Sequence, residues 1–342
     1  MERTGDTTGG AELLTSSPPF PFFVGCGRSG TTLVRSMFDS HPDMAVVYES
    51  FFASRLLRHR RRYEGPGAFN LDRFTSDLTG HFGFRKLGLS PAEVGERLSE
   101  ETPATTADAL RTVYATYAGR QGKSRYGDKT PMYVNVVPVL AGALPEARFV
   151  HIVRDGRNVA LAYLQAPWGP ASLVEACLYW KHNVERGRRA GRRLGPERYR
   201  EVAYEHLTED PEAVLRELCP FLELDFDPAM LCYFERTEEV MATIRNRQHH
   251  QGLSKPVTRG VRDWRTQMAP GDVRTFEALA GPLLDELGYE RSSRGPTMGV
   301  RAGAQLGRLR VEAGRAGRRV GKQRRRAGRG PAAETRQRRP RV

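Results

Sequence analysis

The sequence predicts an α/β protein in which a central, mostly parallel sheet is flanked by helices. Two observations carry this prediction. Short apolar runs that are typical of buried strands alternate along the chain with segments of helical character, as in a parallel sheet. A glycine-rich loop also follows the first of these runs and leads into a helical segment. Together these features indicate a P-loop-like domain.

The apolar runs give the order of the expected elements. Residues 18–24 (PPFPFFV) form a short apolar run closed by glycines, which predicts a buried strand. After the glycine loop, residues 32–40 are expected to be helical and to end at a His-Pro-Asp sequence. The other expected strands are 44–48, 148–153 and 199–203; the other expected helices are 131–143, 156–165, 173–194 and about 210–222, and 51–120 is expected to be mostly helical.

Charge divides the chain into a neutral body and a basic tail. Residues 292–342 contain 16 Lys and Arg and only 2 Glu, so they account for the whole formal charge of +14. The body is therefore not a general polyanion binder. We expect a disordered N-terminus over 1–17, a folded domain over 18–291 and a disordered basic tail over 292–342, because the tail cannot bury enough apolar surface to offset its ordering entropy.

Composition also bears on location and metals. No run of about 18 apolar residues exists, and the N-terminus lacks the basic and apolar regions of a secretory signal. We therefore expect a cytoplasmic protein that contacts an anionic surface, such as the membrane periphery, through its tail. Neither the four cysteines nor the acidic residues and histidines have metal-site spacing, so no metal is expected.

The loop at residues 25–32 (GCGRSGTT) has the features of an anion site. Backbone N–H groups of such a loop and of the helix after it bind phosphate, and Arg28 and the two threonines add donors. Thr31 stands where a nucleotide kinase of the P-loop type has its lysine. A phosphosulfate donor carries less charge than a triphosphate, so a loop without lysine suits it better. The kinase stays open as the enzyme alternative.

Residues 23–50 (FVGCGRSGTTLVRSMFDSHPDMAVVYES) resemble the phosphosulfate loop region of sulfotransferases that use 3′-phosphoadenosine 5′-phosphosulfate (PAPS). A second block, 149–157 (FVHIVRDGR), resembles that superfamily's strand and arginine for the 3′-phosphate. The resemblance spans about residues 20–289, and the tyrosylprotein sulfotransferases and their bacterial relatives are the most similar branch. It implies transfer of a sulfuryl group from PAPS to a hydroxyl of a small molecule, carbohydrate, lipid or peptide tyrosine.

The resemblance also implies roles for individual residues. Glu49 falls on the general base of the tyrosylprotein branch, at the C-terminal end of a predicted strand, where open α/β sheets bind ligands. Lys129 falls on the lysine that stabilises the transferring group, and Arg154 on the arginine for the 3′-phosphate. The remaining expected donor-binding residues are Arg28 (also catalytic), Ser29, Gly30, Thr31, Thr32, Tyr204 and Lys255, with Trp264 just downstream.

Two points are left open by the sequence. Ala162 stands where the superfamily usually has a serine that contributes to the 3′-phosphate site, so another donor has to serve there. His81 could act as the base in place of Glu49, although no motif supports it. A non-enzyme alternative is a binding module that acts through the basic tail, in which case loss of Glu49 would leave its function intact.

Overall fold

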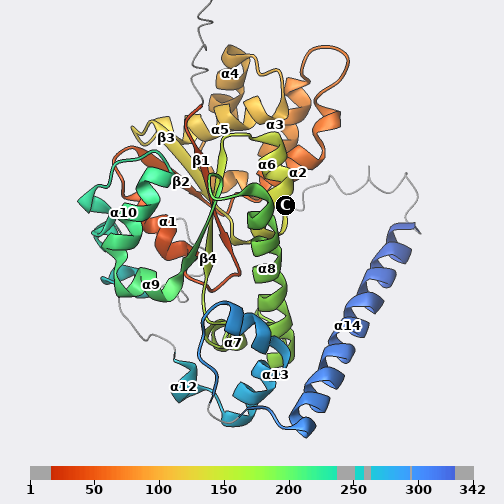
Figure 1. The fold of residues 1–342 in the computed structure, drawn as a ribbon. Coiled ribbons are helices and arrows are strands. Elements are labelled where there is room, and N and C mark those ends of the chain that lie inside the picture. Colours follow the sequence, from red (N-terminus) through yellow and green to blue (C-terminus); the bar gives the residue numbers. More distant parts are fainter. Residues whose placement is uncertain (1–16, 237–250, 258–262, 293–294, 328–342) are drawn as a thin grey trace, which may run out of the picture.

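The computed structural model describes residues 17–236, 251–257, 263–292 and 295–327. Residues 1–16 and 328–342, which belong to the predicted disordered ends, lie outside this range. Within the described residues, five parallel strands form one sheet in the order β2-β3-β1-β4-β5 (Figure 1). The strands are β1 (Phe20–Gly25), β2 (Met44–Tyr48), β3 (Arg125–Lys129), β4 (Ala147–Val153) and β5 (Tyr199–Ala203). The predicted α/β fold with a parallel sheet is confirmed.

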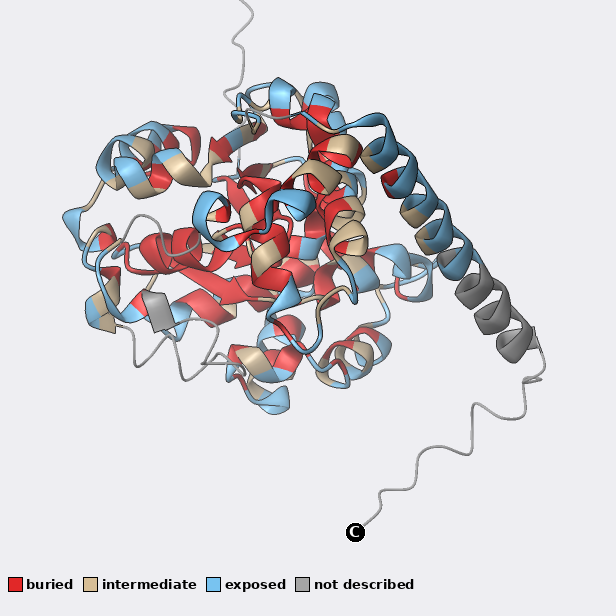
Figure 2. Ribbon diagram, turned by 90° about the horizontal axis from the view of Figure 1, so that it is seen from below, coloured by how far each residue is buried: buried red, intermediate tan, exposed pale blue. Residues whose placement is uncertain are grey.

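Helices cover both faces of this sheet, so β1 is buried along its whole length (Figures 1 and 2). Phe22 belongs to the hydrophobic cluster under one set of helices, and its neighbour Phe23 belongs to the cluster under the other set. This alternation follows from the period of two along a strand. The first set includes α2 (Phe52–Arg58), α3 (Leu71–Thr79), α4 (Pro91–Glu101) and α5 (Thr106–Gly119); the second includes α1 (Thr31–Asp39) and α10 (Pro211–Phe221).

Strand β3 is the element that the sequence analysis missed. Its sequence, RYGDK, is polar and contains residue types that are rare in strands. It nevertheless lies between β1 and β2, where Asp128 pairs with Phe22 and with Val47. The last three residues of the strand are buried. A strand in the interior of a sheet is held by its neighbours' hydrogen bonds, so its own apolar pattern can be weak.

The helix expected over 131–143 is interrupted. A 3₁₀ turn, η3 (Pro131–Asn135), is followed by α6 (Val137–Ala143), and Val136 between them leaves helical geometry. Pro138 explains the break, because proline cannot donate the backbone hydrogen bond that a continuous helix needs there, and it restricts the residue before it.

A third hydrophobic cluster lies next to the C-terminal end of β4. Here α7 (Gly156–Leu164) and α8 (Leu173–Leu194) pack with α13 (Pro270–Glu286) around the buried indole of Trp180. Two short helices, α9 (Tyr204–Glu209) and α12 (Trp264–Gln267), flank this cluster in the chain. The sequence analysis predicted α7 and α8 but not α9, α12 or α13.

Within the stretch 292–342, for which the sequence predicts disorder, residues 298–327 form the long helix α14 (Met298–Ala327). Ala304 is buried in the α8–α13 layer, so tertiary packing adds to the strong helix propensities of Ala, Arg, Leu and Gln. Among the described residues, no helix has both the length and the apolar character needed to cross a membrane.

Candidate active site

The carboxyl ends of the parallel strands meet at one edge of the sheet, and they bring the predicted residues together there. The glycine loop follows β1, Glu49 follows β2 directly, and Lys129 is the last residue of β3. Arg154 follows β4, and Tyr204 opens the helix after β5. Residues separated by more than 170 positions in the sequence therefore surround one site, as expected for ligand binding at this edge.

The loop after β1 has the shape that its glycine requires. Gly30 caps α1 with φ of 93°, a left-handed conformation that favours glycine. A Cβ atom at this position would lie 2.2 Å from the ring of Tyr204, so a side chain cannot be accommodated. The N-terminus of α1, with Thr31 and Thr32 in its first turn, is thereby open to an anion.

Glu49, Lys129 and Thr32 form the centre of the site. The buried ammonium of Lys129 lies 3.1 Å from Oε1 of Glu49 and 3.2 Å from Oγ1 of Thr32. The backbone N–H of Glu49 donates to the carbonyl of Lys129 at 2.8 Å. The carboxylate of Glu49 is 26 % exposed, while the Lys129 side chain is fully buried. The proposed base is therefore accessible, and its partner is shielded from water.

Burial shapes the acid–base behaviour of Lys129. It lowers the pKa of the ammonium from 10.5 to about 8, although the carboxylate of Glu49 acts in the opposite direction. The cation also lies 3.6 Å from the centre of the Tyr48 ring, which stabilises its positive charge.

A second lysine near Glu49 was not identified from the sequence. Lys86, in the 3₁₀ turn η2 (Phe84–Leu87), donates to the carbonyl of Glu49 at 2.9 Å and lies 3.8 Å from its Oε2. Its ammonium is also within 5.8 Å of the ring centres of Phe51 and Phe82. Nothing in the sequence around Lys86 marks it, since only the fold of the 51–120 region brings it to the strand edge.

Buried hydrogen bonds hold the ends of β2 and β3 in place. The hydroxyl of Tyr114 donates to Asp128 at 2.7 Å and accepts from the hydroxyl of Ser50 at 3.0 Å, and Ser50 also bonds to the hydroxyl of Tyr133 at 2.9 Å. Asp128 precedes Lys129 and Ser50 follows Glu49. This network therefore fixes the backbone on which both central side chains stand.

The backbone of the site is strained. Arg28, Glu49 and Phe51 have φ values of 71°, 51° and 54°, in the left-handed region that side chains other than glycine rarely adopt. Such conformations persist where the surrounding structure enforces them, and they gather at functional sites. Here they orient the carboxylate and the loop arginine.

Arg154 and the loop leave buried polar atoms without protein partners. Arg154 is mostly buried, lies 4.4 Å from the ring centre of Tyr204 and makes a long contact of 3.4 Å with the carbonyl of Arg28. Its Nε and the Oγ of Ser29 are buried without hydrogen-bond partners in the described structure. Unpaired buried donors are costly in a folded protein. They fit a site that is completed by an anionic ligand such as the phosphates of PAPS.

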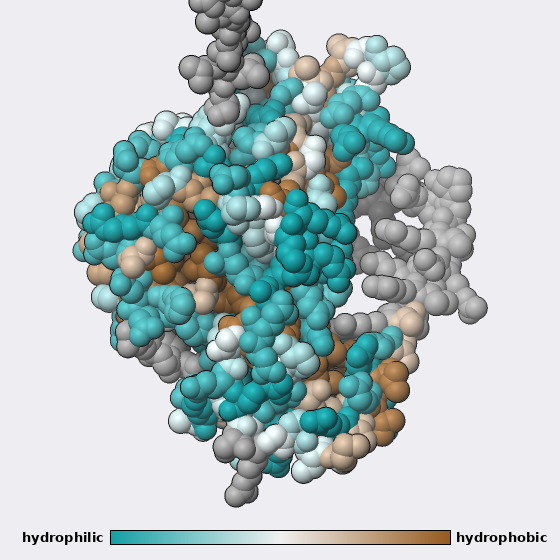
Figure 3. All heavy atoms as spheres, in the orientation of Figure 1, coloured by the Kyte–Doolittle hydropathy of each residue, from teal (hydrophilic) through white to brown (hydrophobic). Residues whose placement is uncertain are grey.

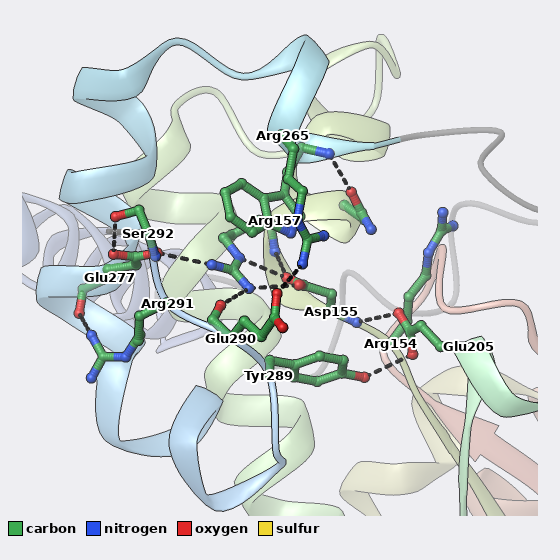
Figure 4. Close-up of polar contacts among 12 residues, drawn as sticks. Arg154, Asp155, Arg157, Glu205, Arg265, Glu277, Tyr289, Glu290, Arg291 and Ser292 are labelled. Atoms are coloured by element: carbon green, nitrogen blue, oxygen red, sulfur yellow. Dashed lines mark hydrogen bonds and ion pairs between the residues drawn. The ribbon is translucent and has the colours of Figure 1, made fainter. Parts of the chain in front are cut away.

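Behind Arg154, a buried ion-pair cluster fixes the start of α7 (Figure 4). Arg157 binds Asp155 through two nitrogens at 2.8 and 3.0 Å, and binds Glu277 of α13 at 2.8 Å. Its guanidinium also lies 3.7 Å from the ring of Trp264. The N–H of Asp155 in turn donates to Glu205 at 3.1 Å. Since the carbonyl of Arg154 accepts from Trp180 at 3.0 Å, its backbone is held on both sides.

The C-terminal end of the predicted domain joins this cluster. The carbonyl of Glu290 accepts from Arg157 at 2.7 Å, and the hydroxyl of Tyr289 donates to Glu205 at 2.9 Å. Ser292 donates to Glu277 through both its N–H and its hydroxyl, at 2.8 and 2.7 Å (Figure 4). The sequence analysis gave these residues no role.

Three further residues that the sequence analysis discussed are Lys255, Trp264 and Ala162. Lys255 is exposed, and its carbonyl accepts from Tyr233 at 2.9 Å; its role in donor binding stays a prediction. Trp264 contacts Arg157 and acts behind the site. Ala162 is buried, but the hydroxyl of the neighbouring Tyr163 reaches the glycine loop, where a Cβ at Gly27 would lie 2.4 Å from it.

One ring nitrogen of His81, the alternative base, is already used in a hydrogen bond within the protein. Its Nδ1 accepts the N–H of Gly83 at 3.0 Å, and burial together with Arg55 and Lys86 lowers its pKa. Within the described residues, no cluster of histidine, cysteine and acidic side chains is arranged to hold a metal.

Comparison with known proteins identifies the family. The model of the Sulfotransferase family matches residues 19–228, which is more than half of the chain. The chain belongs to the sulfotransferase family. The expectation of an enzyme of this class is confirmed, and neither the kinase nor the non-catalytic alternative is supported.

Curated sulfotransferases are similar over most of this chain. A protein-tyrosine sulfotransferase of Drosophila melanogaster is 25% identical over 82% of this chain, which spans only 54% of that protein. Protein-tyrosine sulfotransferase 1 of Danio rerio is 24% identical, with 87% of this chain and 79% of that protein covered. The nodulation protein NoeE of Sinorhizobium fredii is 26% identical, with 80% and 67% covered.

Solved structures support the fold. The sulfotransferase domain of the Synechococcus PCC 7002 olefin synthase has a TM-score of 0.57 at 24% identity, covering 80% of this chain and 96% of that domain. The sulfotransferase domain of the curacin biosynthetic pathway has a TM-score of 0.56 at 18% identity, covering 81% and 99%.

The cluster behind Arg154 predicts a stability effect. Replacing Glu277 by Ala should lower the free energy of unfolding by about 3 kcal/mol, because the buried Arg157 loses one of its two carboxylate partners. Asp285→Ala, which removes an exposed partner of Arg291 from the same helix, should cost much less, because solvent screens an exposed ion pair. Urea unfolding monitored by circular dichroism measures both; equal losses would contradict the role of the cluster.

Proposed function

We propose that this chain transfers the sulfuryl group of PAPS to an acceptor hydroxyl, with Glu49 as the general base. The observation that carries the proposal is the contact between the accessible carboxylate of Glu49 and the buried ammonium of Lys129, beside the anion-binding N-terminus of α1. When bound, PAPS supplies a sulfuryl group activated by its phosphate leaving group. The protein has to align the acceptor, remove its proton and stabilise developing charge.

Each part of the site has a distinct task. The backbone N–H groups of the loop, with Ser29, Thr31 and Thr32, bind the 5′-phosphosulfate, while Arg154 and Tyr204 hold the 3′-phosphate and the adenosine side. Glu49 accepts the proton of the acceptor hydroxyl at a carboxylate oxygen. Lys129 and Arg28 stabilise negative charge around the transferring group. Cytoplasmic location stays a prediction.

The surroundings of Glu49 favour an acceptor with an aromatic ring. Phe82 is 61 % exposed and packs 5.5 Å from Phe51, two residues beyond Glu49. Met132, three residues after Lys129 in the chain, is 38 % exposed. Trp168 is 53 % exposed and packs 5.8 Å from Tyr163, whose hydroxyl reaches the glycine loop. An apolar rim of this kind suits a phenol better than a sugar. We therefore propose a phenolic hydroxyl, such as that of a peptide tyrosine, as the acceptor.

The first test removes the base. Glu49→Gln should bind adenosine 3′,5′-bisphosphate as the wild type does, yet transfer labelled sulfuryl to a tyrosine peptide about a hundredfold to ten-thousandfold more slowly. Glu101→Gln, an exposed carboxylate on α4, is the matched control and should stay fully active. A nearly active Glu49→Gln enzyme would place the base elsewhere, with His81 the first residue to examine. Transfer to sugars but to no phenol would overturn the proposed acceptor.

A second test concerns the 3′-phosphate. Arg154→Ala should weaken binding of adenosine 3′,5′-bisphosphate by about 10- to 100-fold, since a charge-assisted hydrogen bond contributes about 1.5–3 kcal/mol. Its effect on adenosine 5′-monophosphate should be small. Arg148→Ala, which changes an arginine near the start of β4 that pairs with Glu223, controls for loss of a positive charge away from the site. Calorimetry measures all three proteins, and equal losses for both nucleotides would contradict this placement.

The third test is the pH dependence of transfer. Lys129 is cationic below its pKa of about 8 and loses its charge as the pH rises through that value. The rate of transfer should therefore fall above about pH 8. In Lys129→Arg the side chain at this position keeps its charge to much higher pH. The decline of its transfer rate should therefore begin at a higher pH than in the wild type, even if the rate itself is lower. The pH profile of kcat/KM is the measurement; an unchanged limb in Lys129→Arg would assign it to another group.

A further inference from the structure

Exposed hydrophobic side chains gather in two places in the described part of the chain. Of those outside α14, Phe82 packs against Phe51, two residues beyond Glu49, and Trp168 packs against Tyr163, whose hydroxyl reaches the glycine loop; the others are Met132 and Leu164. The other large ones, Met298, Leu306 and Leu309, all belong to α14 and are 80 %, 57 % and 59 % exposed. Figure 3 shows hydrophobic residues gathered at the lower right, where α14 begins in Figure 1. The sulfuryl-transfer site does not account for this second group.

The exposed side chains lie on the face of α14 that points away from the body. Ala304 is buried against the α8–α13 layer, and a Cβ at Gly307 would lie 3.2 Å from Val174 of α8, so these two residues mark the inward face. Met298 and Leu309 are three helical turns apart, on the opposite side, and Leu306 is one turn from Leu309. The helix is thus attached by a narrow stripe of small residues and presents its larger apolar residues to solvent.

The same helix holds most of the basic charge of the tail. Residues 298–327 contain ten Lys and Arg and one Glu, whereas residues 1–291 are formally neutral. An apolar face combined with a high density of basic residues is the pattern of helices that lie in the plane of a membrane interface. We propose that α14 binds an anionic lipid bilayer, with Met298, Leu306 and Leu309 inserted at the boundary of the acyl chains and its arginines against the lipid headgroups.

A bilayer fits this helix better than the other candidate partners. A nucleic acid would neutralise the arginines, but its phosphate backbone offers nothing to the exposed leucines and methionine. A second copy of α14 could cover the apolar face, but it would bring two helices of strongly positive charge together. An anionic bilayer satisfies both features at once, since each basic residue gains attraction at the surface and the apolar face leaves water.

Vesicle flotation with the full chain tests the proposal. Wild-type protein should float with phosphatidylcholine vesicles that contain phosphatidylglycerol and much less with pure phosphatidylcholine. Leu306→Glu/Leu309→Glu should weaken binding at least tenfold. Ala92→Glu/Ser99→Glu makes the same change of charge at exposed positions of α4 and should retain most of the binding. Arg301→Gln/Arg310→Gln should weaken binding about fivefold per charge at low salt, and less as salt is added.

Three outcomes would overturn the proposal. Unchanged vesicle binding by the leucine variant would show that the apolar face is not inserted. Binding to single-stranded RNA, with no binding to anionic vesicles, would assign the helix to nucleic acid. A wild-type dimer in sedimentation velocity that becomes a monomer in the leucine variant, again without vesicle binding, would assign the face to a second copy. Nucleotide binding by every variant verifies folding, and lipid binding is read without any sulfuryl transfer.

Discussion

The buried ammonium of Lys129 is the constraint on which the arrangement of the site depends. A charge that is completely removed from water has to be surrounded by suitable partners, and here these come from the segments that follow the two strands on either side of β3. Thr32 follows β1, Glu49 follows β2 and Lys129 ends β3. In the register of the sheet, Lys129 pairs with Tyr48 on one side and with Phe23 on the other. The C-terminal ends of β1, β2 and β3 therefore lie next to one another at the same edge of the sheet. This places the carboxylate of Glu49 beside the glycine loop that follows β1.

The other half of the site depends on Arg157, which no ligand needs to touch. By binding Asp155, Glu277 and the carbonyl of Glu290, it joins the start of α7 to α13 and to the chain beyond that helix. Arg154 is thereby held at a fixed place while its Nε stays unpaired. Arg154 is thus positioned by a cluster in which Arg157 bonds through all three of its nitrogens, and a binding site can be preorganised in this way.

The sequence predicted those parts of the fold and site whose signals are local. The apolar β1, the glycine loop and the strand before Arg154 were recognised because each is short and continuous. Strand β3 was missed because its stability comes from its neighbours and not from RYGDK itself. Lys86 reaches Glu49 only through the packing of a region without a motif. The helix α14 was not predicted because its attachment depends on the burial of Ala304 against the body, which the composition of the tail does not reveal.

The left-handed backbone of Glu49 has a consequence for how this protein can evolve. A glycine at that position would adopt φ of 51° without steric cost, and replacing a strained residue by glycine relieves of the order of 1 kcal/mol. It would also eliminate the carboxylate beside Lys129. Losing the carboxylate partner of a buried ammonium costs more than the backbone strain that glycine would relieve, so stability itself disfavours glycine at position 49 and the strain persists.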